Sequence, residues 1–347
     1  MKRIFLYDMD RVLLIFLLLA NLENDEIIYV TYEDKKDKLK YLSGKKLILE
    51  NSKMYSHYSF LNRFKMSWYI KELRKINKGI LEAINRDEIE LYGMDNLELG
   101  KRLFFDEKIN VIEEGLLNYM PYNVKENLKK SIMKNIILFI FGLKERKDLM
   151  GYGDLVKKVY FTKGLCEEIP EKLKTKAEIL DLKELWDKKP LKEKEIIKNT
   201  FEFDEKILEV VKGNTTMLFT QPISEDGILS EDEKIEIYRK IIEKYPNERI
   251  IIKPHPREKT DYSKYFPSCY VMKEKYPIEL LTVMGVDITR AVTLFSTAAF
   301  GLGKDVKIDF YGSEVNEKLL KRFGSCDKIM KRNAFIWEDI IWGMERR

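Results

Sequence analysis

The stretch that decides the fold is residues 249–257, Arg-Ile-Ile-Ile-Lys-Pro-His-Pro-Arg. Three consecutive isoleucines in a run of strand length are typical of a parallel strand that is buried on both faces. The two prolines that follow end the strand and fix the backbone on both sides of His255. In an open α/β sheet, ligands bind where strands end in such loops.

On both sides of this segment, compact apolar runs alternate with longer amphipathic stretches, which is the pattern of βαβ units and a parallel sheet. We expect strands at residues 4–7, 27–32, 46–49, 88–92, 108–112, 159–162, 217–220, 249–253, 269–272 and 291–295. We expect helices at 11–22, 60–85, 123–141, 191–212, 230–244 and 337–344. The helix at 230–244 opens with Ser230 and Glu233 in the spacing of a capping box.

The chain of 347 residues is long enough for two domains, each with its own core. Three glycines among mixed charges follow the expected helix at 123–141 and indicate a hinge. They are Gly142, Gly151 and Gly153. We therefore predict an α/β protein with a doubly wound domain at 1–150, a second domain at 151–330 and a C-terminal helix at 331–347.

Charge and cysteine content exclude several classes of function. Because 63 basic residues nearly cancel 58 acidic ones, the net charge is only +5, and no nucleic-acid partner is implied. The three cysteines form no CxxC or Cys/His cluster, so neither a zinc site nor a disulfide framework is indicated, and a reducing cytoplasm fits best. They are Cys166, Cys269 and Cys326.

Two segments could suggest a membrane. The apolar run 12–20 is far shorter than the roughly 20 residues that span a bilayer, so we interpret it as a buried first helix. The lysines at 35–40 alternate with acidic residues and are interpreted as a solvated face. A peripheral contact with the anionic inner face of the cell membrane is the alternative.

The loop after the strand at 217–220 reads Gln-Pro-Ile-Ser-Glu-Asp-Gly, residues 221–227. An acidic turn is often only a solvated one, but this turn directly follows a buried strand. Its candidate substrate residues are Gln221, Glu225, Asp226 and Gly227.

The proline-flanked His255 lies in a basic loop, which suits contact with a phosphate or protonation of a leaving group. Lys253 and Pro256 flank it as candidate ligand contacts. The other histidine, His57, is interpreted as structural.

Two further loops complete the candidate site. Ser296 and Thr297 follow a buried strand and open an expected helix, where they could cap the helix or hold an anion. Glu279 lies in the first turn after Pro277 and could accept ribose hydroxyls or complement the helix dipole. The sequence has no GxxxxGK[ST] or GxGxxG motif and no Asp-x-Asp pair with suitable flanks for a metal clamp.

At these residues the chain resembles bacterial sialyltransferases, most closely glycosyltransferase family 52, the lipooligosaccharide sialyltransferases. The resemblance rests on an acidic-acidic-Gly motif, a His-Pro motif and a Ser/Thr pair, and is clearest from Thr220 to Gly301. It implies a GT-B fold of two Rossmann-like domains facing a central cleft, CMP-sialic acid as donor, inversion at the anomeric carbon, no metal or other cofactor, and a homodimer.

The resemblance also implies roles for residues. His255 would protonate or hydrogen-bond the departing phosphate of CMP, Pro256 would lie against the cytosine, and Ser296 and Thr297 would hold the phosphate. The general base has two candidates. Asp226 of the Glu225-Asp226-Gly227 motif is preferred, and Glu114 of Glu113-Glu114-Gly115 is the alternative.

The sequence therefore predicts a sialyltransferase that acts on a terminal galactose-type hydroxyl of a lipooligosaccharide or other surface glycan. One alternative is a polysialyltransferase or another nucleotide-activated capsule or teichoic-type transferase, since these enzymes share the His-Pro motif and the Ser/Thr pair. A second alternative is a glycan-binding scaffold that kept the fold and lost the chemistry.

Overall fold

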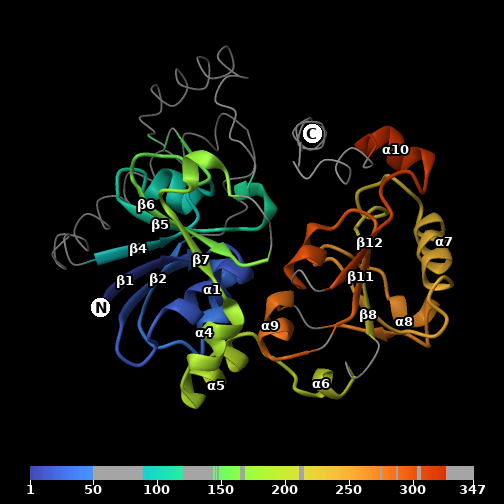
Figure 1. Cartoon of the computed structure of the whole chain (residues 1–347), viewed down its shortest axis with the longest axis horizontal. Coiled ribbons are helices and arrows are strands. Elements are labelled where there is room, and N and C mark those ends of the chain that lie inside the picture. The colour runs from blue at the N-terminus through green and yellow to red at the C-terminus, as the bar shows by residue number, and fades with distance from the viewer. Residues whose placement is uncertain are drawn as a thin grey trace, which may run out of the picture. The chain divides into compact units, whose positions relative to one another are not determined.

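The computed structural model describes residues 1–49, 89–119, 144, 146, 148–164, 169–210, 215–273, 276–286, 288–302 and 306–325. The chain divides into two compact units, Met1–Glu202 and Phe203–Arg347 (Figure 1). Each unit is built on its own parallel sheet. The α/β fold with two parallel sheets that the sequence predicts is confirmed.

The first unit contains a seven-stranded sheet in the order β3-β2-β1-β4-β5-β6-β7, and every pairing is parallel. Its strands are β1 (Lys2–Leu6), β2 (Glu26–Tyr32), β3 (Lys45–Leu49), β4 (Ile89–Gly93), β5 (Ile109–Ile112), β6 (Val156–Thr162) and β7 (Ala177–Leu180). Its helices are α1 (Asp10–Leu19), α4 (Leu182–Lys188) and α5 (Leu191–Thr200), with short turns η1 (Glu33–Leu39), η4 (Leu99–Leu103), η5 (Leu116–Tyr119) and η6 (Glu171–Leu173).

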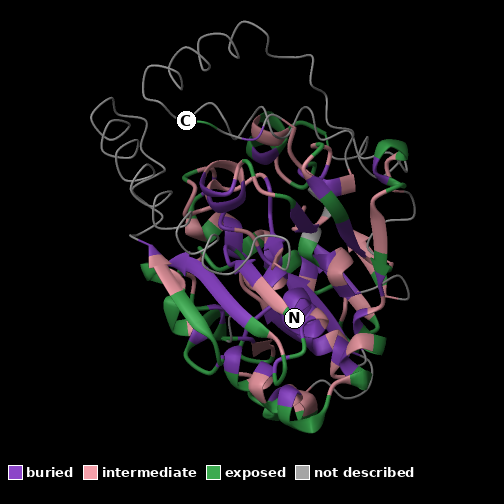
Figure 2. Ribbon diagram, turned by 90° about the vertical axis from the view of Figure 1, so that its left-hand side faces the viewer, coloured by how far each residue is buried: buried purple, intermediate pink, exposed green. Residues whose placement is uncertain are grey.

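Helix α1 contains the apolar run 12–20, which the sequence predicts to be a buried helix and not a membrane anchor. Every residue from Val12 to Leu18 is buried in the unit, which confirms the buried helix. Phe16 stacks on Phe5 of β1 with ring centres 4.1 Å apart, so the helix covers one face of the sheet. Figure 2 shows buried residues concentrated along the strands.

The second unit contains a five-stranded parallel sheet in the order β10-β9-β8-β11-β12. Its strands are β8 (Thr215–Phe219), β9 (Arg249–Lys253), β10 (Tyr270–Val271), β11 (Arg290–Thr293) and β12 (Lys307–Phe310). Its helices are α6 (Lys206–Val210), α7 (Glu231–Ile242), α8 (Tyr262–Tyr265), α9 (Ile278–Val283), η7 (Thr297–Leu302) and α10 (Glu317–Phe323).

Helix α7 is the amphipathic helix that the capping-box pattern predicts. The Ser230 hydroxyl accepts from the Glu233 N–H, and the Glu233 carboxylate accepts from the Ser230 N–H, so both halves of the box are present. The buried face of α7 joins the central core of the sheet. This fixes the helix start directly after the acidic loop at 221–227.

The predicted domain boundary at 150/151 is corrected, because the two compact units divide between Glu202 and Phe203. The strand expected to open the second domain is β6, which instead pairs with β5 of the first sheet, and β7 then pairs with β6. The expected helix at 191–212 is also divided, into α5 and α6.

Some predictions fall outside the described residues. They are the helices at 60–85, 123–141 and 337–344, the C-terminal segment 331–347, Gly142, His57, Cys166 and Cys326. No helix in the described ranges is long and apolar enough to cross a bilayer.

The lysines at 35–40 each contact a carboxylate of the same unit. The pairs are Lys35–Asp8, Lys36–Glu33, Lys38–Asp10 and Lys40–Glu202. This pairing supports the interpretation of the segment as a solvated face.

Candidate active site

The candidate site lies at the carboxyl edge of the second sheet. The chain runs outward from β8 to β9 and β10, and then crosses to β11 and β12 on the other side. The switch point of this sheet is therefore between β8 and β11, which is where ligands bind in open α/β sheets. Phe219 is in register with both Lys253 and Thr293, so β8, β9 and β11 end at the same level. The three predicted loops thus start side by side.

Asp226, from the loop after β8, is held by the loop after β9. Its carboxylate forms a bidentate ion pair with Arg257: Oδ1 lies 2.6 Å from Nη1, and Oδ2 lies 3.2 Å from Nη2. Gly227 follows with a φ of +68°, a left-handed conformation that glycine adopts without a steric penalty. The acidic-Gly pair of the motif therefore turns the chain and directs Asp226 toward the neighbouring loop.

The neighbouring Glu225 has a different environment. Its Oε1 accepts a 2.7 Å hydrogen bond from the Lys259 N–H, and its Oε2 lies 3.0 Å from Nζ of Lys234. Burial raises the pKa of Glu225, but these hydrogen bonds outweigh it and lower the pKa to about 2. Glu225 thus joins the two loops through contacts within the protein, whereas the sequence assigned it to substrate.

His255 is held in one orientation by its own loop. Its Nδ1 accepts a 3.2 Å hydrogen bond from the Arg257 N–H, which leaves the proton of the neutral ring on Nε2. Burial and the nearby Arg257 charge lower the pKa of His255, so the ring is neutral at pH 7. A half-buried histidine in this state presents an N–H donor at Nε2, which suits a phosphate oxygen.

Glu258, three residues after the histidine, is a site residue that the sequence did not predict. Its side chain is fully buried. Oε2 accepts from the Thr220 hydroxyl at 2.5 Å and from the His255 N–H at 2.6 Å. Oε1 accepts from the Tyr262 hydroxyl at 2.5 Å. A charged residue in a polar loop is normally solvent-exposed, and no signal in the sequence distinguishes this glutamate.

The loop after β11 differs from the prediction. Thr297 opens a six-residue 3₁₀ turn, η7, and the side chain of Thr297 is outside the described residues. The Ser296 hydroxyl accepts weakly from the Ala298 N–H at 3.4 Å, and the Ser296 N–H donates to the Thr293 hydroxyl at 2.8 Å. Ser296 therefore caps the turn, in the loop that follows β11 at the switch point.

Glu279 and η7 are brought together by the fold. Helix α9 packs against η7. A Cβ placed on Gly301 would lie only 2.7 Å from Oε1 of Glu279, so the carboxylate lies directly against this glycine. Glu279 is 6% exposed, so its side chain is buried against η7.

The remaining candidates surround these groups. The Gln221 N–H donates to the Tyr238 hydroxyl at 2.7 Å, which ties the acidic loop to α7. Lys253 ends β9 with its ammonium 5.8 Å from the centre of the Tyr276 ring. Pro256 is exposed at the tip of the histidine loop.

The second acidic motif, Glu113-Glu114-Gly115, follows β5 at the carboxyl edge of the first sheet. Glu113 is fully buried and accepts from Arg11 and from the Thr162 N–H, each at 2.8 Å. Glu114 accepts from the Asn96 amide at 3.2 Å, and burial raises the pKa of Glu114. Glu114 and Asp226 thus belong to different units.

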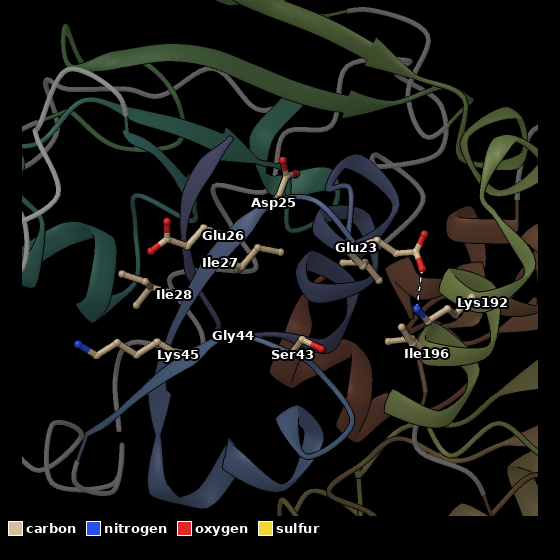
Figure 3. A pocket seen from close by; sticks show the side chains of 11 residues that line it. Glu23, Asp25, Glu26, Ile27, Ile28, Ser43, Gly44, Lys45, Lys192 and Ile196 are labelled. Carbon is tan, nitrogen blue, oxygen red and sulfur yellow. Dashed lines mark ion pairs between the residues drawn. The ribbon is translucent and has the colours of Figure 1, made fainter.

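A pocket of about 530 Å³ in the first unit lies at the opposite end of its strands (Figure 3). Ile27 and Ile28 at the start of β2 and Lys45 at the start of β3 line it, and Lys192 of α5 pairs with Glu23 at 2.7 Å beside it. The amino ends of parallel strands are not where α/β sheets bind substrates, so this pocket is not the candidate site.

Sequence comparison extends the likeness beyond single motifs. The model of glycosyltransferase family 52 matches residues 24–319. A protein of Haemophilus influenzae is 41% identical over 265 residues, which cover 75% of this chain and 81% of that protein.

Solved structures give the same fold. A crystal structure of an α/β-galactoside α-2,3-sialyltransferase from Photobacterium phosphoreum aligns with a TM-score of 0.55 and 13% identity, over 96% of this chain and 97% of that chain. The GT-B domain of a sialyltransferase from Photobacterium damselae aligns with the same score and identity, over 92% of this chain and 96% of that chain. The described units therefore have the GT-B type of fold.

Proposed function

The chain belongs to glycosyltransferase family 52, and we propose that it transfers sialic acid from CMP-sialic acid to a terminal galactose-type hydroxyl of a lipooligosaccharide or other surface glycan. The observation that carries the proposal is the meeting of the acidic loop, the histidine loop and the Ser296 loop around the switch point of the second sheet. The family match and the fold of the two sialyltransferases support it.

The donor phosphate would bind to the groups beside the ends of β9 and β11. The Nε2–H of His255 would donate to a phosphate oxygen, with the ammonium of Lys253 and the Ser296 hydroxyl nearby. A sialyl donor has a tertiary anomeric carbon that favours an oxocarbenium-like transition state. The main task of the enzyme is then to stabilise the charge that develops on the departing phosphate.

Asp226 would act as the general base. Its carboxylate would take the proton of the acceptor hydroxyl as the oxygen attacks the anomeric carbon, while the bond from that carbon to the phosphate oxygen breaks and CMP leaves with the electron pair. Attack opposite to the leaving group inverts the anomeric centre. No metal is needed in this scheme, because His255 and Lys253 supply hydrogen bonds and positive charge at the phosphate.

The test is a transfer assay with CMP-sialic acid and a lactose-type acceptor, in which wild type is compared with the His255→Ala variant. We expect a sialylated product from wild type and a loss of about 100-fold or more in the variant. Equal rates in both proteins would exclude the role given to His255.

Nucleotide binding gives an independent check, because a ligand that binds only the folded protein raises its thermal midpoint. We expect CMP to stabilise the protein more than UDP or CDP does. Stabilisation by UDP or CDP but not by CMP would contradict the sialyl donor and favour another nucleotide-activated transferase. CMP binding without turnover on any glycan would favour the glycan-binding scaffold.

A further inference from the structure

A buried carboxylate links the two motif loops. Glu258 lies between the end of β8 and the histidine loop, and its Oε2 accepts from the Thr220 hydroxyl on one side and from the backbone N–H of His255 on the other. We propose that Glu258 is the positioning residue of the active site. It holds the His255 ring in the orientation and tautomer that the phosphate requires, and Lys234 is a nearby cation that Glu258 shares with Glu225 and Glu231. The catalytic meaning of this inference rests on the proposed function, but the orientation of the ring does not.

The contact with Glu258 closes the histidine turn. The carboxylate binds the N–H of His255, and the Glu258 N–H donates to the His255 carbonyl at 2.9 Å. Both ends of the turn are therefore fixed by one residue. Inside this turn the Arg257 N–H points at Nδ1 of the histidine. If the turn loosens, that hydrogen bond is lost and the proton of the ring is no longer confined to Nε2.

The same carboxylate fixes the turn against the sheet. Thr220 directly follows β8, is 2% exposed, and its N–H donates to the Lys253 carbonyl at 3.2 Å. Glu258 therefore continues the β8–β9 pairing one step beyond the strands, through side chains. This contact anchors His255 to the sheet as well as to its own loop.

Lys234 of helix α7 is the cation near Glu258, and Glu225 and Glu231 share it. Its side chain is fully buried, and Nζ lies 3.0 Å from Glu225, 3.2 Å from Glu231 and 3.8 Å from Glu258. A buried carboxylate without a nearby cation or hydrogen-bond donors is strongly destabilising. Because α7 starts in a complete capping box, the lysine has a rigid base.

Glu231 provides a matched control. It also faces Lys234, and it accepts from the Ser224 and Thr260 hydroxyls at 2.6 Å each, but it has no described contact with Thr220 or His255. Shortening either glutamate to aspartate keeps a carboxylate near Lys234. Only the Glu258→Asp change withdraws the oxygen from the His255 N–H.

The experiment is ¹⁵N NMR of imidazole-labelled protein without substrate, which is simple because the chain has two histidines. A His57→Gln variant identifies the His255 signals. In wild type we expect the Nε2–H tautomer of His255. The Glu258→Asp variant should show averaged tautomers and a pKa of His255 that moves up toward its ordinary value. The Glu231→Asp variant should match wild type.

Glu258→Gln is the conservative rescue, because its amide oxygen can replace Oε2 as acceptor for His255 and Thr220, and it should retain the wild-type His255 spectrum. If Glu258→Asp does not fold, Thr220→Val tests the same link by removing a donor to Oε2 at nearly constant shape, and should also mix the tautomers. Wild-type His255 signals in folded Glu258→Asp, or equal changes in the Glu231→Asp control, would overturn the proposal.

Kinetics separate this inference from the proposed function. In the transfer assay, Glu258→Asp should lower kcat about 10- to 100-fold with a smaller change in the KM for CMP-sialic acid, since a misplaced group affects the reacting geometry more than binding. Wild type and all variants could be inactive in transfer while Glu258→Asp still alters the His255 tautomer by NMR. In that case the proposed function fails and the positioning role stands. Unchanged kcat in Glu258→Asp beside an active wild type would overturn the positioning role alone.

Discussion

Arg257 binds the carboxylate of Asp226 with both of its terminal guanidinium nitrogens, at 2.6 and 3.2 Å. The two residues lie on loops that follow different strands, and the arginine is two residues from His255. A bidentate ion pair fixes the orientation of a carboxylate better than a single contact does. The proposed base and the proposed phosphate ligand are therefore held by one connected set of side chains.

The choice of base is testable by two isosteric changes. Because Asp226 belongs to the same loop cluster as His255, Asp226→Asn should lower kcat about 100- to 10,000-fold and leave CMP affinity near wild type. Glu114→Gln should stay within a few-fold of wild type. Steady-state transfer kinetics of both variants decide between them, and the opposite pattern would assign the base to the first unit.

The state of His255 predicts the pH dependence of transfer. Burial and the Arg257 charge lower the pKa of His255, so the neutral donor form dominates above pH 6.5. We expect kcat/KM to stay level from pH 6.5 to 8 and to fall at lower pH, because a proton on Nδ1 removes the acceptor of the Arg257 N–H that orients the ring. His255→Gln, which keeps an N–H donor near Nε2, should retain more activity than His255→Ala. A rate that falls steadily above pH 6.5 in wild type would instead indicate that the ring must start protonated.

Asp8 should make the first unit less stable at neutral pH. Burial raises the pKa of Asp8 from 3.8 to about 6, and within the described residues its Oδ2 has no hydrogen-bond partner. A carboxyl group with a raised pKa binds its proton more tightly in the folded state, so stability falls as pH rises from 3.8 to 6. Asp8→Asn removes this loss and should stabilise the protein by up to about 3 kcal/mol at pH 8.

The check for Asp8 is the thermal midpoint of both proteins at two pH values. The midpoint of Asp8→Asn should exceed that of wild type at pH 8, and the difference should disappear below pH 3.8. An equal difference at both pH values would mean that the charge of Asp8 is not its cause.

Gly301 tests whether the contact between α9 and η7 shapes the donor site. An added methyl group would lie 2.7 Å from the Glu279 carboxylate and 3.2 Å from Ile278, so the buried carboxylate or one of the two elements must shift. Overpacking of this kind costs about 1–3 kcal/mol. Gly301→Ala should weaken CMP binding about tenfold or more by calorimetry, while Ala298→Ser at an exposed position of the same turn should not. Equal CMP affinities in Gly301→Ala and wild type would place the nucleotide elsewhere.

Removal of metal should leave transfer unchanged. Because Lys253 and His255 are proposed to supply the charge and hydrogen bonds at the phosphate, we expect equal rates with and without EDTA. Loss of activity in EDTA that Mg²⁺ or Mn²⁺ restores would require a metal-bound donor.

Much of the fold follows from local sequence. The strand at 249–253 is found where three isoleucines predict it, and α7 starts where Ser230 and Glu233 predict a capping box. Buried parallel strands must be apolar on both faces, so they can be recognised in the sequence as continuous apolar runs. The strands that the sequence missed, β7 and β12, each lie at one edge of a sheet. Both are only partly buried, and their alternation with charged residues hides them.

The domain boundary could not be predicted from local sequence. The strand predicted at 159–162 is found as part of β6, but nothing in its residues says which sheet it joins. Its partner β5 ends more than 40 residues earlier in the chain, and that pairing decides that the first unit continues to Glu202. Strand pairing is a long-range choice, so only the tertiary structure gives it.

The sequence by itself determined most of the strands, the loops that follow them and the residue types of the candidate site, because burial, proline, glycine and capping act over a few neighbouring residues. Only the tertiary structure decided that Glu225 faces Lys234, that Arg257 holds Asp226 and that Glu258 binds both Thr220 and His255. In sequence, Glu258 and Lys234 are ordinary charged residues. Their buried role depends on which strands lie side by side, since parallel strands bring distant loops together at one edge of a sheet.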